Sequence, residues 1–239
     1  MSEKSRKRLT IGGLIFAIVC LILLSLKNQV YYPEMPARDA VKSAKAKKNF
    51  TYFEGSKKPL VIFYPGALVE PESYGIWAKK VAENGYPVAI AHFPLDFALL
   101  SVNRADQIDK KGGYVIGGHS LGGVCAARYA AERKHQKNLK GVFLMASYAD
   151  EKGDLSKTGI PVLQITASRD GVIKKERLKE NNRFLPGNAV KKVIQGGNHS
   201  GFGAYTTQKG DNKARISTQQ QQEKVAEIMI GWLDSLDKK

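Results

Sequence analysis

The sequence predicts an α/β fold, in which a mostly parallel sheet carries helices on both faces. From residue 60 onward, short and uniformly apolar segments alternate with longer segments of helical periodicity. Strands that are apolar at successive positions are typical of a parallel sheet covered on both faces. The chain has 239 residues, which suffices for one such domain and an appendage, and no internal repeat interrupts the alternation.

The expected elements follow one another in a simple order. Strands are expected at residues 60–64, 87–91, 114–118, 141–146, 160–167 and 189–194. Helices are expected at residues 73–84, 103–109, 121–135, 174–183 and 218–236. The last helix carries an apolar stripe that includes Val225, Met229 and Trp232, and residues 219–222 are expected to form its solvated first turn. The connection 147–159 is short and polar, so we expect no sizeable cap domain.

The first residues predict a membrane anchor. Residues 9–26 are uncharged, and as a helix these 18 residues span about 27 Å, close to the thickness of a hydrocarbon core. The basic residues before them favour a cytoplasmic N-terminus. We expect a basic tail and a single transmembrane helix over 1–27, a juxtamembrane linker over 28–49, and a folded domain over 50–239 on the outer side of the cell membrane. A cleaved signal peptide is the alternative, although the apolar run is long for one and no A-x-A pattern follows it.

Charge and cysteine content limit the partners. The formal net charge is +16, with +7 in residues 1–49 and +9 in residues 50–239. No arginine-rich or aromatic-interleaved motif for nucleic acid accompanies this charge, so we expect a surface that faces anionic lipids or envelope polymers. The two cysteines, Cys20 and Cys125, imply no disulfide framework. The few histidines and cysteines lack ligand spacing, so we expect no metal and no organic cofactor.

One expected strand and the helix after it enclose Gly118-His119-Ser120-Leu121-Gly122, a G-x-S-x-G motif. In this motif the serine occupies a strained turn between strand and helix, and the small glycines on either side prevent clashes. The turn exposes the hydroxyl at the edge of the sheet, where the N-terminus of the new helix favours developing negative charge. Ser120 is therefore the candidate nucleophile.

A serine hydroxyl needs a base to take its proton and an acid to orient that base. The base comes last in the chain order of this motif, whereas His92 and His119 precede Ser120. His135 lies about 22 Å from the motif along the helix. Elimination leaves His199, in a glycine-rich loop after the last expected strand, where sites of open α/β sheets form.

Two aspartates are candidates for the acid. Asp170 follows the expected strand 160–167 at its carboxyl end and lies between the nucleophile and the base in sequence. We expect Asp170 to orient His199. Asp150, which follows the preceding strand, is the alternative, although it lies in a segment that resembles an exposed turn.

The tetrahedral oxyanion of acyl transfer needs two backbone N–H donors. Leu121, the residue after the nucleophile, is expected to supply one of them. Ala67, in the turn after the first expected strand, is expected to supply the other, with Leu68 as the next choice. We also expect Leu68, His119 and Phe202 to contribute to substrate binding.

At these residues the chain resembles the α/β-hydrolase superfamily, and it looks closest to a branch of small bacterial hydrolases related to dienelactone hydrolases, often with an N-terminal membrane segment. The matching stretches are Tyr64-Pro65-Gly66-Ala67, Gly117-Gly118-His119-Ser120-Leu121-Gly122-Gly123, Ser168-Arg169-Asp170-Gly171, Gly196-Gly197-Asn198-His199, and Phe202-Gly203-Ala204-Tyr205 with Gly210-Asp211. The resemblance implies the α/β-hydrolase fold and a triad of Ser120, Asp170 and His199. Dienelactone hydrolases proper use a cysteine nucleophile, so their lactone substrate is not implied.

Taken together, these features predict a membrane-anchored serine hydrolase that cleaves an ester or related acyl bond of a small molecule through an acyl-enzyme. An acyltransferase or a thioesterase would use the same residues and differ in the acceptor of the acyl group. A non-catalytic module that binds the cell envelope on a hydrolase scaffold is the other alternative. A complete triad with its glycines argues against that alternative.

Overall fold

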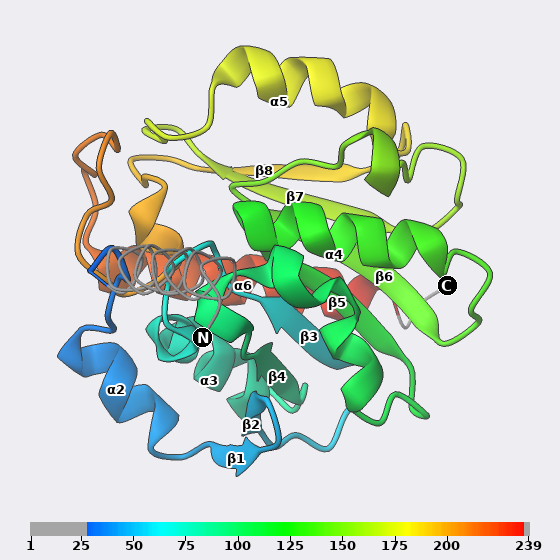
Figure 1. Ribbon diagram of the computed structural model, residues 1–239, viewed down its shortest axis with the longest axis horizontal. Coiled ribbons are helices and arrows are strands. Elements are labelled where there is room, and N and C mark those ends of the chain that lie inside the picture. The colour runs from blue at the N-terminus through cyan, green and yellow to red at the C-terminus, as the bar shows by residue number, and fades with distance from the viewer. Residues whose placement is uncertain (1–27, 237–239) are drawn as a thin grey trace, which may run out of the picture. The chain divides into compact units, whose positions relative to one another are not determined.

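The computed structural model describes residues 28–236, and Figure 1 shows their course. An eight-stranded sheet forms the centre, with the strand order β1-β2-β4-β3-β5-β6-β7-β8. The strands are β1 (Lys45–Lys47), β2 (Phe50–Phe53), β3 (Leu60–Tyr64), β4 (Val88–Ala91), β5 (Tyr114–His119), β6 (Leu139–Met145), β7 (Val162–Ala167) and β8 (Val190–Ile194). Strands β3 to β8 run parallel to one another, whereas β2 is antiparallel to both of its neighbours, β1 and β4. The crossover between β3 and β4 places β3 beside β5, so the loops that follow these two strands lie next to each other.

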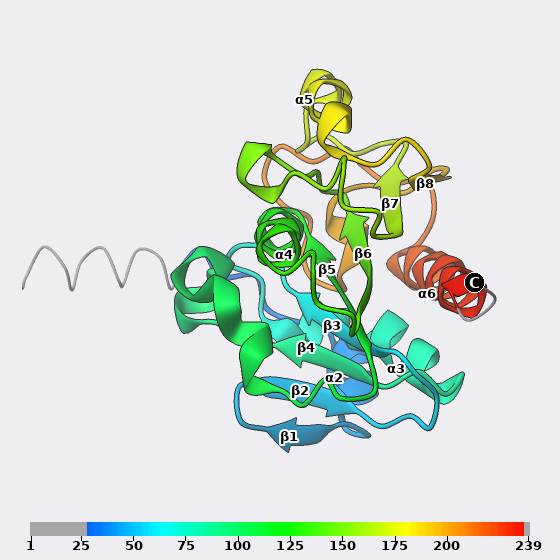
Figure 2. The same ribbon diagram turned by 90° about the vertical axis from the view of Figure 1, so that its right-hand side faces the viewer.

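Helices cover both faces of this sheet. The α-helices are α2 (Met35–Val41), α3 (Gly75–Glu83), α4 (Leu121–Glu132), α5 (Lys175–Asn181) and α6 (Thr218–Leu236). Short 3-10 segments are η1 (Pro71–Tyr74), η2 (Pro94–Asp96), η3 (Ala98–Gln107), η4 (Glu151–Gly153), η5 (Asn182–Phe184) and η6 (Ser200–Phe202). Figure 2 shows α3 and α6 on one side of the sheet and α4 on the other. This arrangement confirms the predicted α/β class.

The two faces of the sheet carry separate apolar clusters, because successive side chains of a strand point to opposite sides. In β3, Val61 and Phe63 pack with Trp77 of α3 and Trp232 of α6. On the opposite face, Ile62 and Tyr64 pack with the α4 side of the molecule. The central strands β3 and β4 are buried on both faces and are therefore apolar at successive positions, whereas the edge strand β8 is largely exposed and carries Lys191 and Lys192.

The expected strands and long helices are present, with ends displaced by a few residues. Two segments differ in kind. The expected helix 73–84 begins with the 3-10 segment η1 and becomes α3 only at Gly75. The expected helix 103–109 is instead part of η3, which begins at Ala98. The connection between β6 and β7 holds only the single turn η4, so no cap is inserted there.

The folded unit begins at Tyr31, which corrects the expected linker 28–49 and the expected start of the domain at residue 50. The Tyr31 N–H donates to the Leu68 carbonyl at 2.7 Å, and the Glu34 N–H donates to the Ala204 carbonyl at 2.8 Å. Ala37 of α2 is fully buried, and β1 pairs with β2. These contacts are made to distant parts of the chain, so the local composition of the segment gave no sign of them.

The predicted anchor, residues 9–26, lies outside the described residues, and so does the rest of the expected tail. Within residues 28–236, no helix combines the length and the apolar character needed to cross a membrane.

Candidate active site

Ser120 stands between the end of β5 and the start of α4 in a strained backbone conformation. Its φ is 51° and its ψ is −124°, a combination that residues other than glycine rarely adopt. The neighbouring strand holds this turn in place. The Ser120 N–H donates to the Met145 carbonyl at 3.0 Å, and the Ser147 hydroxyl donates to the Ser120 carbonyl at 2.7 Å. The turn predicted from the G-x-S-x-G motif is therefore present and is anchored to the end of β6.

Two glycines allow this turn to pack against the end of β3. A Cβ atom on Gly122 would lie 2.2 Å from the carbonyl oxygens of both Tyr64 and Pro65. A Cβ atom on Gly118 would lie 2.4 Å from the Tyr64 carbonyl oxygen. Because backbone atoms cannot move aside as a flexible side chain can, no larger residue fits at either position. The first turn of α4 thus lies directly against the loop that carries Ala67.

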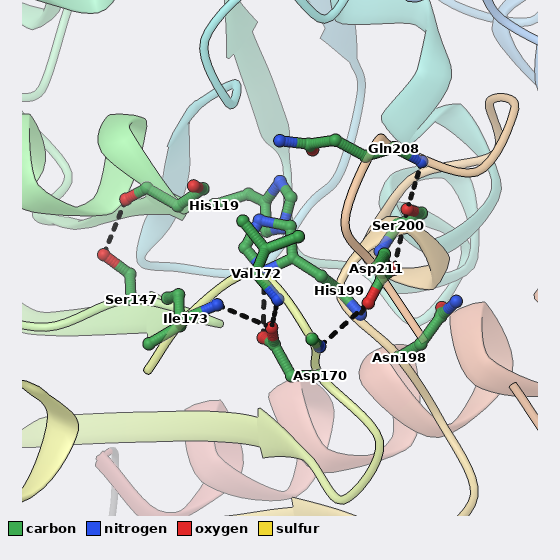
Figure 3. A network of polar contacts seen from close by, with 12 residues as sticks. His119, Ser147, Asp170, Val172, Ile173, Asn198, His199, Ser200, Gln208 and Asp211 are labelled. Carbon is green, nitrogen blue, oxygen red and sulfur yellow. Dashed lines mark hydrogen bonds and ion pairs between the residues drawn. The ribbon is translucent and has the colours of Figure 1, made fainter. Parts of the chain in front are cut away.

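Asp170 and His199 form a buried pair close to His119, the residue before Ser120 (Figure 3). His199 Nδ1 lies 2.8 Å from Asp170 Oδ2. The other oxygen, Oδ1, accepts the N–H groups of Val172 and Ile173, both at 2.9 Å. Because the Asp170 carboxylate accepts hydrogen bonds, the nitrogen that faces it, Nδ1, carries the proton of a neutral His199. The lone pair of the ring is then on Nε2. That Nε2 atom is buried and has no hydrogen-bond partner among residues 28–236.

The alternative acid, Asp150, has other partners. Its carboxylate receives hydrogen bonds from the Arg128 guanidinium, at 3.2 Å to Oδ1 and 3.1 Å to Oδ2 from Nε, and from the Gly153 N–H at 3.1 Å. Burial by itself raises the pKa of Asp150, but these donors outweigh burial and hold the pKa below its usual value. The carboxylate therefore joins α4 to the start of η4. Among the described residues, the carboxylate that contacts His199 is that of Asp170, and Asp150 makes no contact with this histidine.

Asp211 connects the loop that carries Asp170 to the loop that carries His199. Its Oδ1 accepts the N–H groups of Gly171 at 3.0 Å and His199 at 3.3 Å. Its Oδ2 accepts both the N–H and the hydroxyl of Ser200 at 2.8 Å. One carboxylate thus fixes the residue after Asp170 and the two residues 199 and 200, as Figure 3 shows. The sequence drew attention to Asp211 only through the resemblance, without a role.

The first turn of α6 also supports the loop that carries His199. The expected solvated turn at residues 219–222 is correct for Gln219 and Gln220, which are exposed, and wrong for Gln221 and Gln222. Gln221 and Gln222 are buried, with exposures of 1% and 0%. Gln221 accepts the Asn198 N–H at 3.0 Å and donates to the Asn198 carbonyl at 2.8 Å. Gln222 donates to the Gly201 carbonyl at 2.9 Å. Polar side chains at the start of a helix look solvated in the sequence, and only the packing of α6 under the loop gives them partners.

His119 links the nucleophile turn to the loop after β3. Its Nδ1 lies 2.9 Å from the Tyr74 hydroxyl, which also accepts the Gly66 N–H at 3.0 Å. The Tyr74 hydroxyl therefore donates to Nδ1, and the proton of a neutral His119 is on Nε2. Complete burial lowers the pKa of His119 well below its usual value, and the nearby His199 acts in the same direction. The two imidazole rings have centroids 4.5 Å apart.

The three expected substrate-binding residues, Leu68, His119 and Phe202, do not line the cleft that opens beside Ser120. Phe202 and His119 are completely buried, and their rings stack with centroids 5.6 Å apart. They pack behind the site and do not form its wall, because Phe202 belongs to the apolar core of the α6 face. Leu68 is half-buried, with φ at 58°. Its N–H donates to the Asp96 carbonyl at 2.9 Å, so it is unavailable as the second oxyanion donor.

A cleft of about 370 Å³ opens beside the nucleophile turn. Its walls come from the start of α4, the loop after β6 and the loop after β7, and the lining residues are Ser120, Leu121, Val124, Tyr148, Val172, Ile173, Lys174 and Arg177. Sequence reasoning missed Tyr148, Lys174 and Arg177. The only signal for them was their position after the carboxyl ends of β6 and β7, which does not tell which side chains face Ser120.

The comparisons with known proteins agree with this geometry. A sequence model of the Alpha/beta hydrolase family matches residues 60–223. A comparison with curated proteins found no match. Similar solved structures include MGS-MChE2, an alpha/beta hydrolase enzyme from the metagenome of sediments of the Mar Chica lagoon in Morocco, with 18% identity, 81% of this chain and 99% of that chain covered, and a TM-score of 0.58.

Two further structures are similar at the level of the fold. Est1E from Butyrivibrio proteoclasticus has 16% identity, with 80% of this chain and 94% of that chain covered and a TM-score of 0.58. A putative lipase from Acinetobacter baumannii AYE has 16% identity, with 85% and 95% covered and a TM-score of 0.59. At such identities the likeness concerns the fold and leaves the substrate open.

The burial of His119 predicts a loss of stability in acid. Its pKa is lowered in the folded state, so the unfolded chain binds more protons below its ordinary pKa of about 6.5. The free energy of unfolding should therefore fall by up to about 1.4 kcal/mol for each pH unit below 6.5.

His119→Asn keeps an acceptor for Tyr74 and removes this titration. Denaturant unfolding at pH 6.5 and pH 5 should show a smaller fall for this variant than for the wild type. The matched control is His135→Asn at an exposed position, and an equal fall in all three proteins would contradict the prediction.

The contacts of Asp211 predict a positioning role. Asp211→Asn replaces one acceptor oxygen by an N–H₂ group, which cannot accept both sets of N–H donors. The loops that carry Asp170 and His199 should shift relative to each other, and kcat/KM for a short ester should fall on the order of 10²-fold. The exposed Asp39→Asn change is the control and should leave the rate unchanged. Circular dichroism should show that both variants are folded. A rate for Asp211→Asn within about twofold of the wild type would refute the role.

Proposed function

The chain belongs to the Alpha/beta hydrolase family, and from this premise we propose that it is a serine hydrolase that cleaves an ester or related acyl bond through an acyl-enzyme. The observation that carries the proposal is the Asp170–His199 pair, in which Nε2 of His199 has no hydrogen-bond partner among the described residues. The His199 ring packs against the ring of His119, the residue before Ser120, with centroids 4.5 Å apart. A nucleophile on a strained turn, a base with a free lone pair and an acid that orients the base are the groups that acyl transfer by serine requires.

In the proposed mechanism the Ser120 hydroxyl attacks the acyl carbon while His199 Nε2 accepts its proton. Asp170, bound to Nδ1 at 2.8 Å, stabilises the imidazolium that forms. The oxyanion of the tetrahedral intermediate receives the N–H groups of Leu121 and Ala67. Within residues 28–236, neither N–H group has a hydrogen-bond partner, whereas the neighbouring N–H groups of Gly66 and Leu68 are both occupied. His199 then gives its proton to the leaving alcohol, and water repeats the sequence on the acyl-enzyme.

The N-terminus of α4 contributes to the same step. The twelve-residue helix begins immediately after Ser120, so its unpaired N–H groups and the positive end of its dipole lie beside the developing charge. An electrostatic contribution of this kind acts more strongly in the transition state than in the ground state, which is the condition for catalysis.

We further propose that the substrate is a small acyl ester. The cleft, with a volume of about 370 Å³, is large enough for a small molecule, and the connection between β6 and β7 inserts no cap over it. A fold-level relative, Est1E, has been solved with ferulic acid bound, at a TM-score of 0.55 and 16% identity. We also propose that the chain is related to the branch of small bacterial hydrolases that includes the dienelactone hydrolases. This proposal rests on the motifs around Asp170 and His199.

The location of the enzyme is a separate proposal. The basic residues 4–8 and the uncharged residues 9–26 support a single transmembrane helix, with the catalytic domain outside the cytoplasmic membrane. Anionic lipids or envelope polymers would then face the basic surface of the domain.

The triad is tested by three substitutions. Ser120→Ala and His199→Ala should each reduce kcat by several orders of magnitude, because the three groups act as a unit. Asp170→Asn should reduce kcat on the order of 10⁴-fold. Asp150→Asn is the matched control and should keep most of the activity. A fluorophosphonate probe should label the wild type and not Ser120→Ala. If Asp150→Asn loses activity and Asp170→Asn does not, the acid has been misassigned.

The location is tested by protease accessibility. Cells stripped of their wall are treated with protease, and the domain is detected with an antibody. We expect loss of the domain from intact cells and survival of a cytoplasmic control protein. Full protection in intact cells, followed by digestion after lysis, would reverse the proposed orientation. Recovery of the domain in the medium before protease is added would instead indicate a cleaved signal peptide.

A further inference from the structure

The cleft beside Ser120 combines an apolar floor with two cationic side chains. Leu121, Val124, Val172 and Ile173 contribute the apolar part. Lys174 and Arg177 are the only charged residues that line the cleft, which contains no carboxylate within the described part of the chain. Lys174 contributes an ammonium group and Arg177 a guanidinium group, and the binding of a neutral ester requires neither charge.

Arg177 is held toward the cleft by Tyr148, which lines the same space from the loop after β6. The Arg177 guanidinium donates to the Tyr148 hydroxyl at 3.3 Å. Its central carbon lies 5.9 Å from the centroid of the Tyr148 ring. A guanidinium has five N–H donors in a planar fork, so the bond to Tyr148 leaves most of them available.

Neither cation is neutralised by the protein. Among residues 28–236, no carboxylate lies within ion-pair distance of Lys174 or Arg177, although Glu176 and Glu180 are on the same helix. The segment 174–183 contains five lysines and arginines against two glutamates. By contrast, Arg128 of α4 is already paired with Asp150.

We propose that this part of the cleft is an anion subsite, so that the preferred substrate carries a carboxylate or phosphate a short apolar spacer away from its scissile ester. The inference rests on the proposed hydrolase function and adds the substrate class. The ester carbonyl lies at Ser120, the spacer contacts Val124, Val172 and Ile173, and the anion meets Arg177 and Lys174. A planar carboxylate or a phosphate can accept two parallel N–H groups of one guanidinium.

The solvent exposure of Lys174 and Arg177 determines how large a preference for an anionic substrate we expect. Lys174 and Arg177 are both exposed, so water and salt weaken their attraction for an anion. We therefore expect a preference of about tenfold in kcat/KM, which is smaller than a fully buried ion pair would produce. The preference should decrease as the ionic strength rises from about 0.01 M to about 1 M, because the screening length falls from about 30 Å to about 3 Å.

The test compares matched esters on the purified full-length protein. Mono(4-nitrophenyl) adipate carries a terminal carboxylate on the acyl side, 4-nitrophenyl 5-phosphonopentanoate carries a phosphonate there, and 4-nitrophenyl hexanoate is the neutral match. 4-Acetoxybutanoate carries a carboxylate on the alcohol side of its ester, and butyl acetate is its neutral match. We expect one side of the ester to show the preference of about tenfold for the anion, and the phosphonate arm separates a carboxylate from a phosphate subsite.

The variants decide whether the cleft cations cause the preference. In Arg177→Gln and Lys174→Gln, the ratio of kcat/KM for the anionic ester to kcat/KM for the neutral ester should fall toward one. General damage to the enzyme would instead lower both values and leave their ratio unchanged. Lys179→Gln lies on the same helix but does not line the cleft, so its ratio should equal that of the wild type. Arg177→Glu should reverse the ratio in favour of 4-nitrophenyl 6-aminohexanoate.

The two proposals fail in different ways. If the wild type hydrolyses the neutral esters but shows no preference for any anionic one, or if Arg177→Gln keeps the preference, the anion subsite is wrong and the hydrolase stands. If the wild type hydrolyses none of the esters and resists the fluorophosphonate probe, the proposed function is wrong and the subsite is overturned with it.

Discussion

The backbone of Ser120 is the constraint on which the rest of the site depends. A serine held at a φ of 51° costs on the order of 1–3 kcal/mol and persists only where its surroundings leave no alternative. Here the end of β6 binds both its N–H and its carbonyl, and Gly122 lets α4 begin against the carbonyl oxygens of β3 and its loop. The same turn therefore places the hydroxyl at the sheet edge, starts the helix beneath it and brings the Leu121 N–H near the Ala67 loop.

The second half of the site is assembled from loops that are far apart in the sequence. Asp170 follows β7 and His199 follows β8, so the parallel order of the sheet brings their loops to one edge. Asp211 and Gln221 then hold the two loops through side chain to backbone hydrogen bonds. A carboxylate has two oxygens that can each accept more than one N–H group, and this suits Asp211 to keeping the loops of Asp170 and His199 in register.

The chemistry of the cleft is decided by which side chains the loops turn inward. The catalytic groups are common to a superfold that supports many reactions, so they do not select a substrate. Tyr148, Lys174 and Arg177 differ in this respect, because they are the groups that a bound molecule would meet beyond the scissile bond. The buried pair of Phe202 and His119 instead supports the wall from behind and keeps the nucleophile turn rigid.

Local sequence alone determined strands β3 to β8, the long helices and the turn at Ser120, because apolar runs and a G-x-S-x-G motif express constraints between near neighbours. It did not predict β1 and β2. Chain order and the scarcity of histidines were enough to select His199, and the position after a strand was enough to favour Asp170. Tertiary structure decided the rest. It made residues 31–49 part of the domain, buried Gln221 and Gln222, paired Asp150 with Arg128, and placed Arg177 in the cleft that Ser120 lines. Each of these depends on contacts between segments distant in the chain, and such contacts leave no periodic pattern in the residues that make them.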